Sequence, residues 1–129
     1  MTDPRLGLTV THRRYVPHAQ AHYGGALVHG AYALELFGDV ATELCVRADG
    51  DEGLLAGYSQ VRFTAPIRAG DVVEATGTLT RVGNRSRTVE LRCVVVCRAR
   101  PDRSPSAAEV LDPPLVAVQA TATVVVPAP

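Results

Sequence analysis

The stretch from Ala26 to about Arg47 restricts the fold more than any other part of the chain. It contains no proline, and its only glycines are Gly30 and Gly38. As a helix, it would carry apolar residues on nearly every side, at positions 27, 28, 31, 33, 34, 36, 37, 40, 41, 44, 45 and 46. A helix that is apolar on most sides is buried on most sides. The rest of the chain therefore has to surround one long helix.

Five other segments have the character of β-strands, and turn-forming residues separate them. They are residues 6–16 before the helix and residues 54–65, 71–82, 86–98 and 115–126 after it. The alternation is clearest in residues 86–98, where Val89, Leu91 and Cys93 face one way and Thr88 and Glu90 face the other. Residues 82–86, Val-Gly-Asn-Arg-Ser, have the chemistry of a hairpin turn.

Strands joined by hairpins predict an antiparallel sheet, and such a sheet needs one face covered. The apolar helix is the natural filling. We therefore predict an α+β chain with the hotdog fold, in which a five-stranded antiparallel sheet wraps around one long central helix. Residues 101–114 are rich in Pro and Ser and are expected to form a polar loop. Residues 1–129 contain no internal repeat and are expected to form a single domain.

The charge balance excludes some classes of partner. Lys+Arg and Asp+Glu both number 13, and every basic residue except the four histidines is arginine. A chain without net charge is not expected to bind nucleic acid or an anionic membrane broadly. We find no signal peptide and no membrane-spanning run, which predicts a cytoplasmic protein. Three cysteines at positions 45, 93 and 97 predict small buried side chains and neither a disulfide scaffold nor a metal site.

Five segments carry a resemblance to a known family. They are residues 21–30 (AHYGGALVHG), 36–44 (LFGDVATEL), 49–54 (DGDEGL), 61–71 (VRFTAPIRAGD) and 82–87 (VGNRSR). In these segments the chain resembles the 3-aminobutyryl-CoA ammonia-lyases and the similar beta-alanyl-CoA ammonia-lyases, which are hotdog proteins. The likeness spans about residues 15–100.

The resemblance implies reversible loss of ammonia from a beta-aminoacyl-CoA to give an enoyl-CoA. It also implies a homodimer or larger homo-oligomer, with thioester sites at subunit interfaces beside the start of the central helix. The chain departs from the family pattern Gly-Gly-Asn-Leu-Val-Asp-Gly, because Ala26 and His29 replace its Asn and Asp. The sequence Val28-His29-Gly30 is similar instead to the helix start of many hotdog thioesterases.

Thioester chemistry needs donors that hold negative charge on the carbonyl oxygen. A glycine-flanked helix N-terminus supplies free N–H groups and the positive end of the helix dipole. Four small residues, Gly24, Gly25, Gly30 and Ala31, would let a thioester approach such a backbone. They are therefore candidate substrate-binding residues, although the glycines are also compatible with a tight turn alone.

The same chemistry needs a base. At helical spacing, Tyr32, Glu35, Asp39, Thr42 and Glu43 form one polar stripe on the otherwise apolar helix. Within this stripe, Asp39 and Glu43 lie one turn apart and are the candidate catalytic carboxylates, with Glu35 a weaker one. Mutual repulsion and burial would raise the pKa of one of the two. A solvated helix face or a subunit contact would also explain the stripe.

Histidine and arginine side chains complete the candidate site. His29 is a candidate catalytic residue that would orient the carbonyl or hold a water, and His22 and Tyr23 are candidate substrate-binding residues. The candidates for a CoA phosphate are Arg85 and Arg87 beside the hairpin turn, followed by Arg62 and Arg68. His12 and His18 are expected at the surface. No spacing typical of metal ligands occurs, so we predict no metal site. We also predict no separate cofactor, because CoA would be part of the substrate.

Three functions remain open from the sequence. The first is a carbon–nitrogen lyase, or the reverse addition of an amine to an enoyl thioester carried by CoA or acyl-carrier protein. The second is a thioesterase, alone or combined with amine addition. The third is a binding module that has kept the fold without the chemistry.

Overall fold

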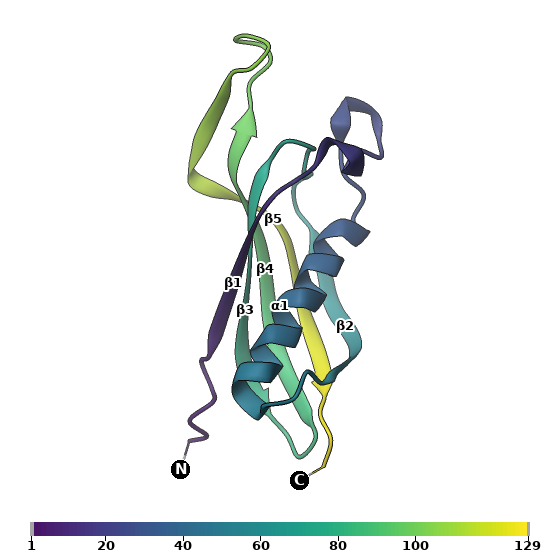
Figure 1. Ribbon diagram of the computed structural model, residues 1–129, viewed down its shortest axis with the longest axis vertical. Helices are drawn as coiled ribbons and strands as arrows, with labels where there is room; N and C mark the ends of the chain where they lie inside the picture. Colours follow the sequence, from purple (N-terminus) through teal and green to yellow (C-terminus); the bar gives the residue numbers. More distant parts are fainter. Residues whose placement is uncertain (1, 129) are drawn as a thin grey trace.

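The computed structural model describes residues 2–128. The elements follow one another as β1 (Thr9–Tyr15), two short 3₁₀ turns η1 (His18–Gln20) and η2 (Gly24–Ala26), α1 (Ala31–Asp49), β2 (Leu54–Phe63), β3 (Val72–Val82), β4 (Ser86–Ala99) and β5 (Ala108–Val125). The strands form one antiparallel sheet in the order β1-β3-β4-β5-β2. The sheet curves around α1, which lies against one of its faces (Figure 1). The predicted hotdog architecture is confirmed.

The helix begins later than the sequence predicts, at Ala31 and not at Ala26. Gly25 and Ala26 have φ angles of 70° and 62°, in the left-handed region that a right-handed helix cannot contain. Leu27 then forms a β-bridge with Arg68, so the backbone before the helix is extended. The helix ends at Asp49, where Gly50 adopts a φ of 67° and donates its N–H to the carbonyl of Val46.

The prediction of a polar loop over residues 101–114 is wrong in its second half. Only residues 100–107 form the turn, and β5 already begins at Ala108, opposite Ala99. The pairing of β4 with β5 skips residues 111–114, which holds the two prolines in a bulge where no ladder hydrogen bond is needed. We call residues 97–112 the arm, because they extend beyond the end of the molecule at which α1 begins (Figure 1).

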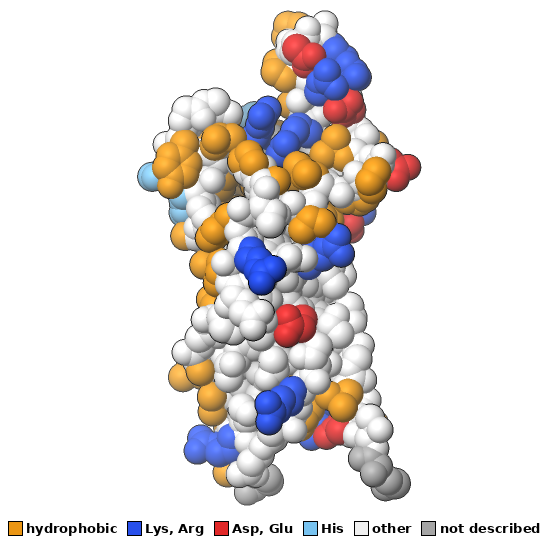
Figure 2. All heavy atoms as spheres, turned by 180° about the vertical axis from the view of Figure 1, so that it is seen from behind, with side chains coloured by type: hydrophobic (Ala, Val, Ile, Leu, Met, Phe, Trp, Pro, Cys, Tyr) orange, Lys and Arg blue, Asp and Glu red, His pale blue; other side chains and the backbone are white. Residues whose placement is uncertain are grey.

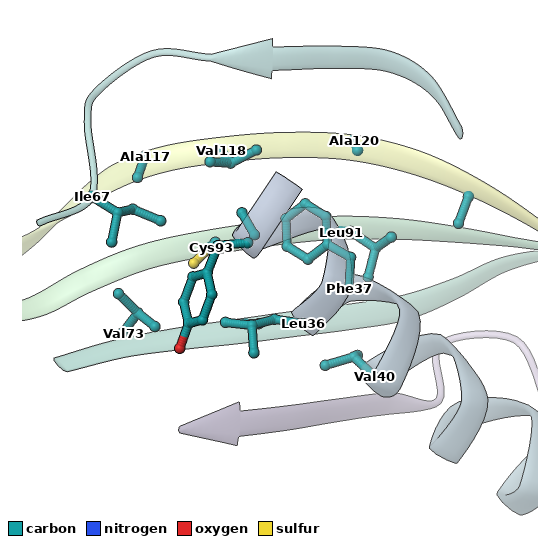
Figure 3. Packing of buried hydrophobic residues seen from close by; sticks show 14 of the residues in the cluster. Leu36, Phe37, Val40, Ile67, Val73, Leu91, Cys93, Ala117, Val118 and Ala120 are labelled. Carbon is teal, nitrogen blue, oxygen red and sulfur yellow. The ribbon is translucent and has the colours of Figure 1, made fainter. Parts of the chain in front are cut away.

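The core lies between α1 and the inner face of the sheet. Phe37, Val40 and Leu44 of the helix are completely buried against strand residues such as Val73 and Cys93. Figure 3 shows side chains of the helix and of the strands pointing toward one another in this layer. Tyr32 belongs to the core as well, so it does not share a polar surface with the other residues of the stripe that helical spacing predicts.

The outer face of the sheet carries hydroxyl and amide side chains. Neighbouring strands are linked there by pairs of threonine hydroxyls, Thr9 with Thr78 and Thr11 with Thr76. Figure 2 shows this face, on which isolated arginines and acidic residues stand among uncharged polar atoms. Within residues 2–128, no helix is long and apolar enough to cross a membrane.

Two buried arginine–aspartate pairs hold opposite ends of the molecule. At the end of the helix, Arg87 donates from Nε and Nη2 to both oxygens of Asp49, at 2.9 and 2.8 Å. At the other end, Arg98 binds both oxygens of Asp71 in the same way, at 3.0 and 2.8 Å. Charges that are buried in this way need a partner to offset their desolvation.

The hydrogen bonds from Arg87 lower the pKa of Asp49, and the charge of Arg5 adds to this effect. We therefore expect Asp49→Asn to cost about 3 kcal/mol of unfolding free energy at neutral pH, because Arg87 stays buried without its anion. A carboxylate whose pKa is depressed by folding stabilises the protein above its unfolded pKa, about 3.9, and stops doing so as the pH falls through the folded value. The difference between wild type and variant should thus be full above pH 4 and shrink below it.

Urea unfolding followed by circular dichroism between pH 2.5 and 7 measures this difference. Asp102→Asn, which removes the exposed partner of Arg100, is the matched control and should change nothing measurable. Equal effects of the two substitutions at pH 7 would contradict the assignment.

Candidate functional site

A cavity of about 460 Å³ opens beside the start of α1. Its lining comes from the segment before the helix, the first helical turns, the end of β2 with the loop that follows, and β5. The lining residues are Tyr23, Leu27, Val28, His29, Gly30, Ala33, Phe63, Thr64, Ala65, Pro66, Ile67 and Val118. Most of these side chains are apolar, and the imidazole of His29 is the ionisable group nearest the helix start among them.

Hydrogen bonds between two loops hold the helix start in place. The N–H of Val28 donates to the carbonyl of Ile67 at 2.9 Å, and the N–H of Ala69 donates to the carbonyl of Ala26 at 2.9 Å. The segment before the helix is therefore fixed to the loop that follows β2. Gly30 occupies the N-cap position and has no side chain to cap the helix, so the first N–H groups are not satisfied in that way. Such N–H groups are suited to an anionic oxygen.

Gly30 lies in close contact with an aromatic ring. A Cβ atom at this position would lie 2.8 Å from Cε1 and Cζ of Phe63, whose ring lies over the helix start. Phe63 is the last residue of β2 and is 56% exposed. The ring therefore forms one wall of the cavity and remains accessible from outside. Gly24 and Gly25 differ from Gly30, because an added Cβ would meet nothing within 4 Å at either position.

The predicted aromatic and histidine candidates do come together. The ring of His22 lies edge-on to the rings of both Tyr23 and His29, at centroid distances of 4.7 and 5.0 Å. His29 is half-buried, whereas His22 and Tyr23 are exposed at the mouth of the cavity. The three side chains form a chain of polar groups that leads from solvent to the helix start.

Asp39 lies elsewhere on the helix. It is nine residues beyond Gly30, which places it about 13 Å along the axis from the helix start within one chain. Its side chain is exposed and makes no hydrogen bond or ion pair with residues 2–128. Burial raises the pKa of Tyr58 on β2, and the negative charge of Asp39 raises it further, so the two groups are within electrostatic reach.

Glu43 is engaged by two partners. Its carboxylate accepts a hydrogen bond from Nε of Arg47 at 2.8 Å and lies 2.8 Å from Nε2 of His12 on β1. These contacts, that of Arg47 first, lower the pKa of Glu43. The predicted repulsion with Asp39 therefore does not raise the pKa of this carboxyl group, because two donors face it.

His12 is not the surface residue that the sequence predicts. Its side chain is 16% exposed, and its Nδ1 atom is buried without a partner in the described chain. The alternation in β1 could have predicted that His12 is buried. Residues two apart in a strand share a face, and Val10 is a core residue.

Arg85 and Arg87 do not reach this cavity within one chain. Arg87 is buried at the far end of the helix, and its donors are used by Asp49 and by the carbonyls of Gly83 and Ser86. Arg85 lies in the same turn and binds the carbonyl of Val126. The prediction that Arg87 meets a CoA phosphate is therefore not supported, because no free face of its guanidinium is exposed. Arg68 is exposed beside the cavity loop.

Metal ligands do not gather at the site. Within residues 2–128, no group of three His, Cys, Asp or Glu side chains is arranged to hold a metal ion. The two most buried cysteines, Cys45 and Cys93, are free and lie in the core, and burial raises the pKa of the Cys93 thiol to about 12. What the cavity offers is an apolar pocket, a helix N-terminus and imidazole groups.

Comparisons with known proteins agree with this geometry. The model of the thioesterase superfamily matches residues 25–96, which include the helix start, the whole helix, β2, β3 and most of β4. A hexameric hotdog-fold thioesterase of Campylobacter jejuni has the same fold, with a TM-score of 0.72 over 96% of this chain and 82% of that one, at 16% identity.

Two relatives are much more similar in sequence. The 3-aminobutyryl-CoA ammonia lyase of Acetoanaerobium sticklandii is 50% identical over 107 residues, which cover 83% of this chain and 85% of the relative. The beta-alanyl-CoA:ammonia lyase of Clostridium propionicum has a solved structure that is 35% identical, with a TM-score of 0.89 over 94% of this chain and 86% of that one. The chain belongs to the thioesterase superfamily and, within it, to the family of the 3-aminobutyryl-CoA and beta-alanyl-CoA ammonia lyases.

Proposed function

We propose that the protein is a carbon–nitrogen lyase that eliminates ammonia or an amine from a beta-aminoacyl thioester, and that it also catalyses the reverse addition to an enoyl thioester. The observation that carries the proposal is the 50% identity with a 3-aminobutyryl-CoA ammonia lyase over 83% of the chain. The apolar cavity beside the helix N-terminus supports it, since it offers room for a short acyl chain and donors for the thioester oxygen.

In the proposed reaction, the helix N-terminus holds the thioester carbonyl oxygen. A base removes a proton from the alpha carbon, and the electron pair moves onto the carbonyl oxygen to form an enolate. The enolate then re-forms the carbonyl and the alpha–beta double bond, while the beta carbon–nitrogen bond breaks and the amine leaves with a proton. Gly24, Gly25, Gly30 and Ala31 let the substrate approach the backbone at this point.

His29 is the group in the cavity that is suited to move the proton of the amine. It takes the position at which the family pattern has a carboxylate, and it contacts His22, which in turn contacts Tyr23. A neutral imidazole accepts a proton and an imidazolium donates one, and the row of rings leads from His29 to the mouth of the cavity. We assign His22 and Tyr23 to the mouth of the site.

Asp39 is the proposed base for the alpha proton. Glu43 is the less suitable carboxylate, because two hydrogen bonds stabilise its charge and lower its pKa. Asp39 is free of such contacts within the described residues, but it lies about 13 Å from the helix start of its own chain. The base that serves one cavity therefore comes from a second copy of the chain.

A free strand edge supports this assembly. β2 is the last strand in the order of the sheet, so its outer edge pairs with no strand of residues 2–128. Leu54, Leu55 and Phe63 on this strand are exposed, and Leu54 is exposed to 77%. Unpaired apolar edges are usually covered in native proteins. We propose a homodimer or larger homo-oligomer in which a second copy covers this edge.

Hydrolysis of the thioester is the second candidate. The match to the thioesterase superfamily and the His29-Gly30 helix start favour it, because a water held by His29 would face the same polarised carbonyl. Acyl-carrier protein in place of CoA remains part of this proposal. A protein that binds the thioester without reacting is the third outcome that the following assay distinguishes.

We expect purified protein, incubated with crotonyl-CoA and ammonia or glycine, to form the beta-amino adduct with its thioester intact. Mass spectrometry of the adduct and of free CoA measures both reactions at once. Free CoA without adduct would replace the lyase by a thioesterase, and unchanged crotonyl-CoA with every amine would leave only binding.

Substitution of single carboxylates decides which one is the base. We expect Asp39→Asn to lower kcat by about 10²- to 10⁴-fold, the usual contribution of a positioned acid–base group. Glu43→Gln keeps the size of its side chain and should lower kcat less than tenfold, since it changes a contact with His12 and Arg47. The reverse order of effects would move the catalytic role to Glu43.

Light scattering at micromolar concentration should give at least twice the mass of one chain. Leu54→Asp places a charge on the exposed apolar edge and should release monomers, whereas Val110→Asp changes an equally exposed apolar residue of the arm and should not. A wild-type monomer would exclude the shared site.

A further inference from the structure

The buried pair of Asp71 and Arg98 stands behind one wall of the cavity. Asp71 is 1% exposed and Arg98 is 15% exposed, so the charges are largely withdrawn from water. Besides its two bonds to Asp71, Arg98 donates from Nη2 to the carbonyl of Pro66 at 2.9 Å. Asp71 also accepts the backbone N–H of Arg68 at 2.8 Å. One ion pair therefore fixes both ends of the loop at residues 66–68.

This loop is part of the proposed site. Pro66 and Ile67 line the cavity directly. The carbonyl of Ile67 accepts the N–H of Val28, which directly precedes His29 and Gly30. The path from the ion pair to the helix start thus consists of the loop and one further hydrogen bond, and every contact in it involves a backbone atom.

A second contact extends the path to Asp71 itself. The N–H of Val16 donates to the carbonyl of Asp71 at 2.8 Å, and the N–H of Gly70 donates to the carbonyl of Val16 at 2.8 Å. The end of β1 and the start of the histidine-containing loop are therefore fixed at the same point. Arg98 faces Glu109 in the register of β4 and β5, so the arm begins here too.

We propose that Asp71 and Arg98 are positioning residues for the thioester site, which set the distance between the loop at residues 64–70 and the helix start. The expected loss of kcat/KM rests on the proposed function. The pair touches neither the cavity nor the substrate. It acts through Pro66 and Ile67 on Val28, and thereby on the direction of the first N–H groups of α1 and on His29. Errors of about 1 Å in such groups reduce rates by about a hundredfold.

The chain contains its own control for this proposal. Asp49 and Arg87 form a pair with the same two-bond geometry and similar burial, at the opposite end of α1. The helix between the two ends is about 27 Å long. Asp71→Asn and Asp49→Asn are therefore the same chemical change in two similar pairs, of which only one stands behind the cavity.

The experiment compares these two variants in the full-length protein, well below the temperature at which either unfolds. We expect both to lose stability in urea, and Asp71→Asn alone to lower kcat/KM for crotonyl-CoA and ammonia by about tenfold or more. Arg98→Lys, which keeps the charge and loses the fork, should fall between wild type and Asp71→Asn. If Asp71→Asn does not fold, Arg98→Lys is compared with Asp49→Asn in its place.

Amide hydrogen exchange supplies a readout that does not need activity. The N–H groups of Val28 and Ala69 should exchange about tenfold faster in Asp71→Asn or Arg98→Lys and remain unchanged in Asp49→Asn. Unchanged exchange at both amides, or equal losses of kcat/KM in the Asp71 and Asp49 variants, would overturn the proposal. If exchange changes as expected and the wild type turns over no thioester, the proposed function fails and the positioning role does not.

Discussion

A single helix has to cover a whole sheet in this protein, and the rest of the structure depends on that constraint. Phe37, Val40 and Leu44 fill the concave face of the sheet, and burial of such side chains is the main favourable contribution to folding. Tyr58 and Val61 of β2 pack against this core, whereas Leu54 and Leu55 at the start of the strand remain exposed. Within residues 2–128, the same arrangement leaves the outer edge of β2 unpaired.

The position of the site follows from how the helix is connected to the sheet. The chain must turn from an extended segment into the helix while it passes the loop after β2. The left-handed residues Gly25 and Ala26 allow this turn, and hydrogen bonds from Val28 and Ala69 join the two segments. The turn leaves the N-terminus of the helix open beside an apolar cavity. Two buried ion pairs, one at each end of the helix, hold this arrangement.

The sequence predicts periodic features well and single contacts poorly. The helix body, the five strands and the hairpin at residues 83–86 follow from periodicity and turn chemistry, and the structure has them. The sequence predicts the start of the helix five residues too early, because a left-handed alanine at position 26 has no signature in composition. The pairing of Asp71 with Arg98, 27 residues apart, depends on strand register and is likewise invisible to local patterns. For the same reason, local patterns place His12 at the surface and make Arg87 a candidate for a CoA phosphate, although both are buried by contacts between distant segments.

Phe63 is shared by two features of the molecule. It is the last residue of the free edge strand β2, and its ring forms a wall of the cavity over Gly30. A chain that pairs with this edge changes the surroundings of the ring, and a ligand in the cavity does the same from the other side. Two binding events that act on one side chain are thermodynamically coupled, and the coupling is reciprocal. In the assembly that we propose, subunit affinity and thioester affinity are therefore linked quantities, and each depends on how far the other site is filled.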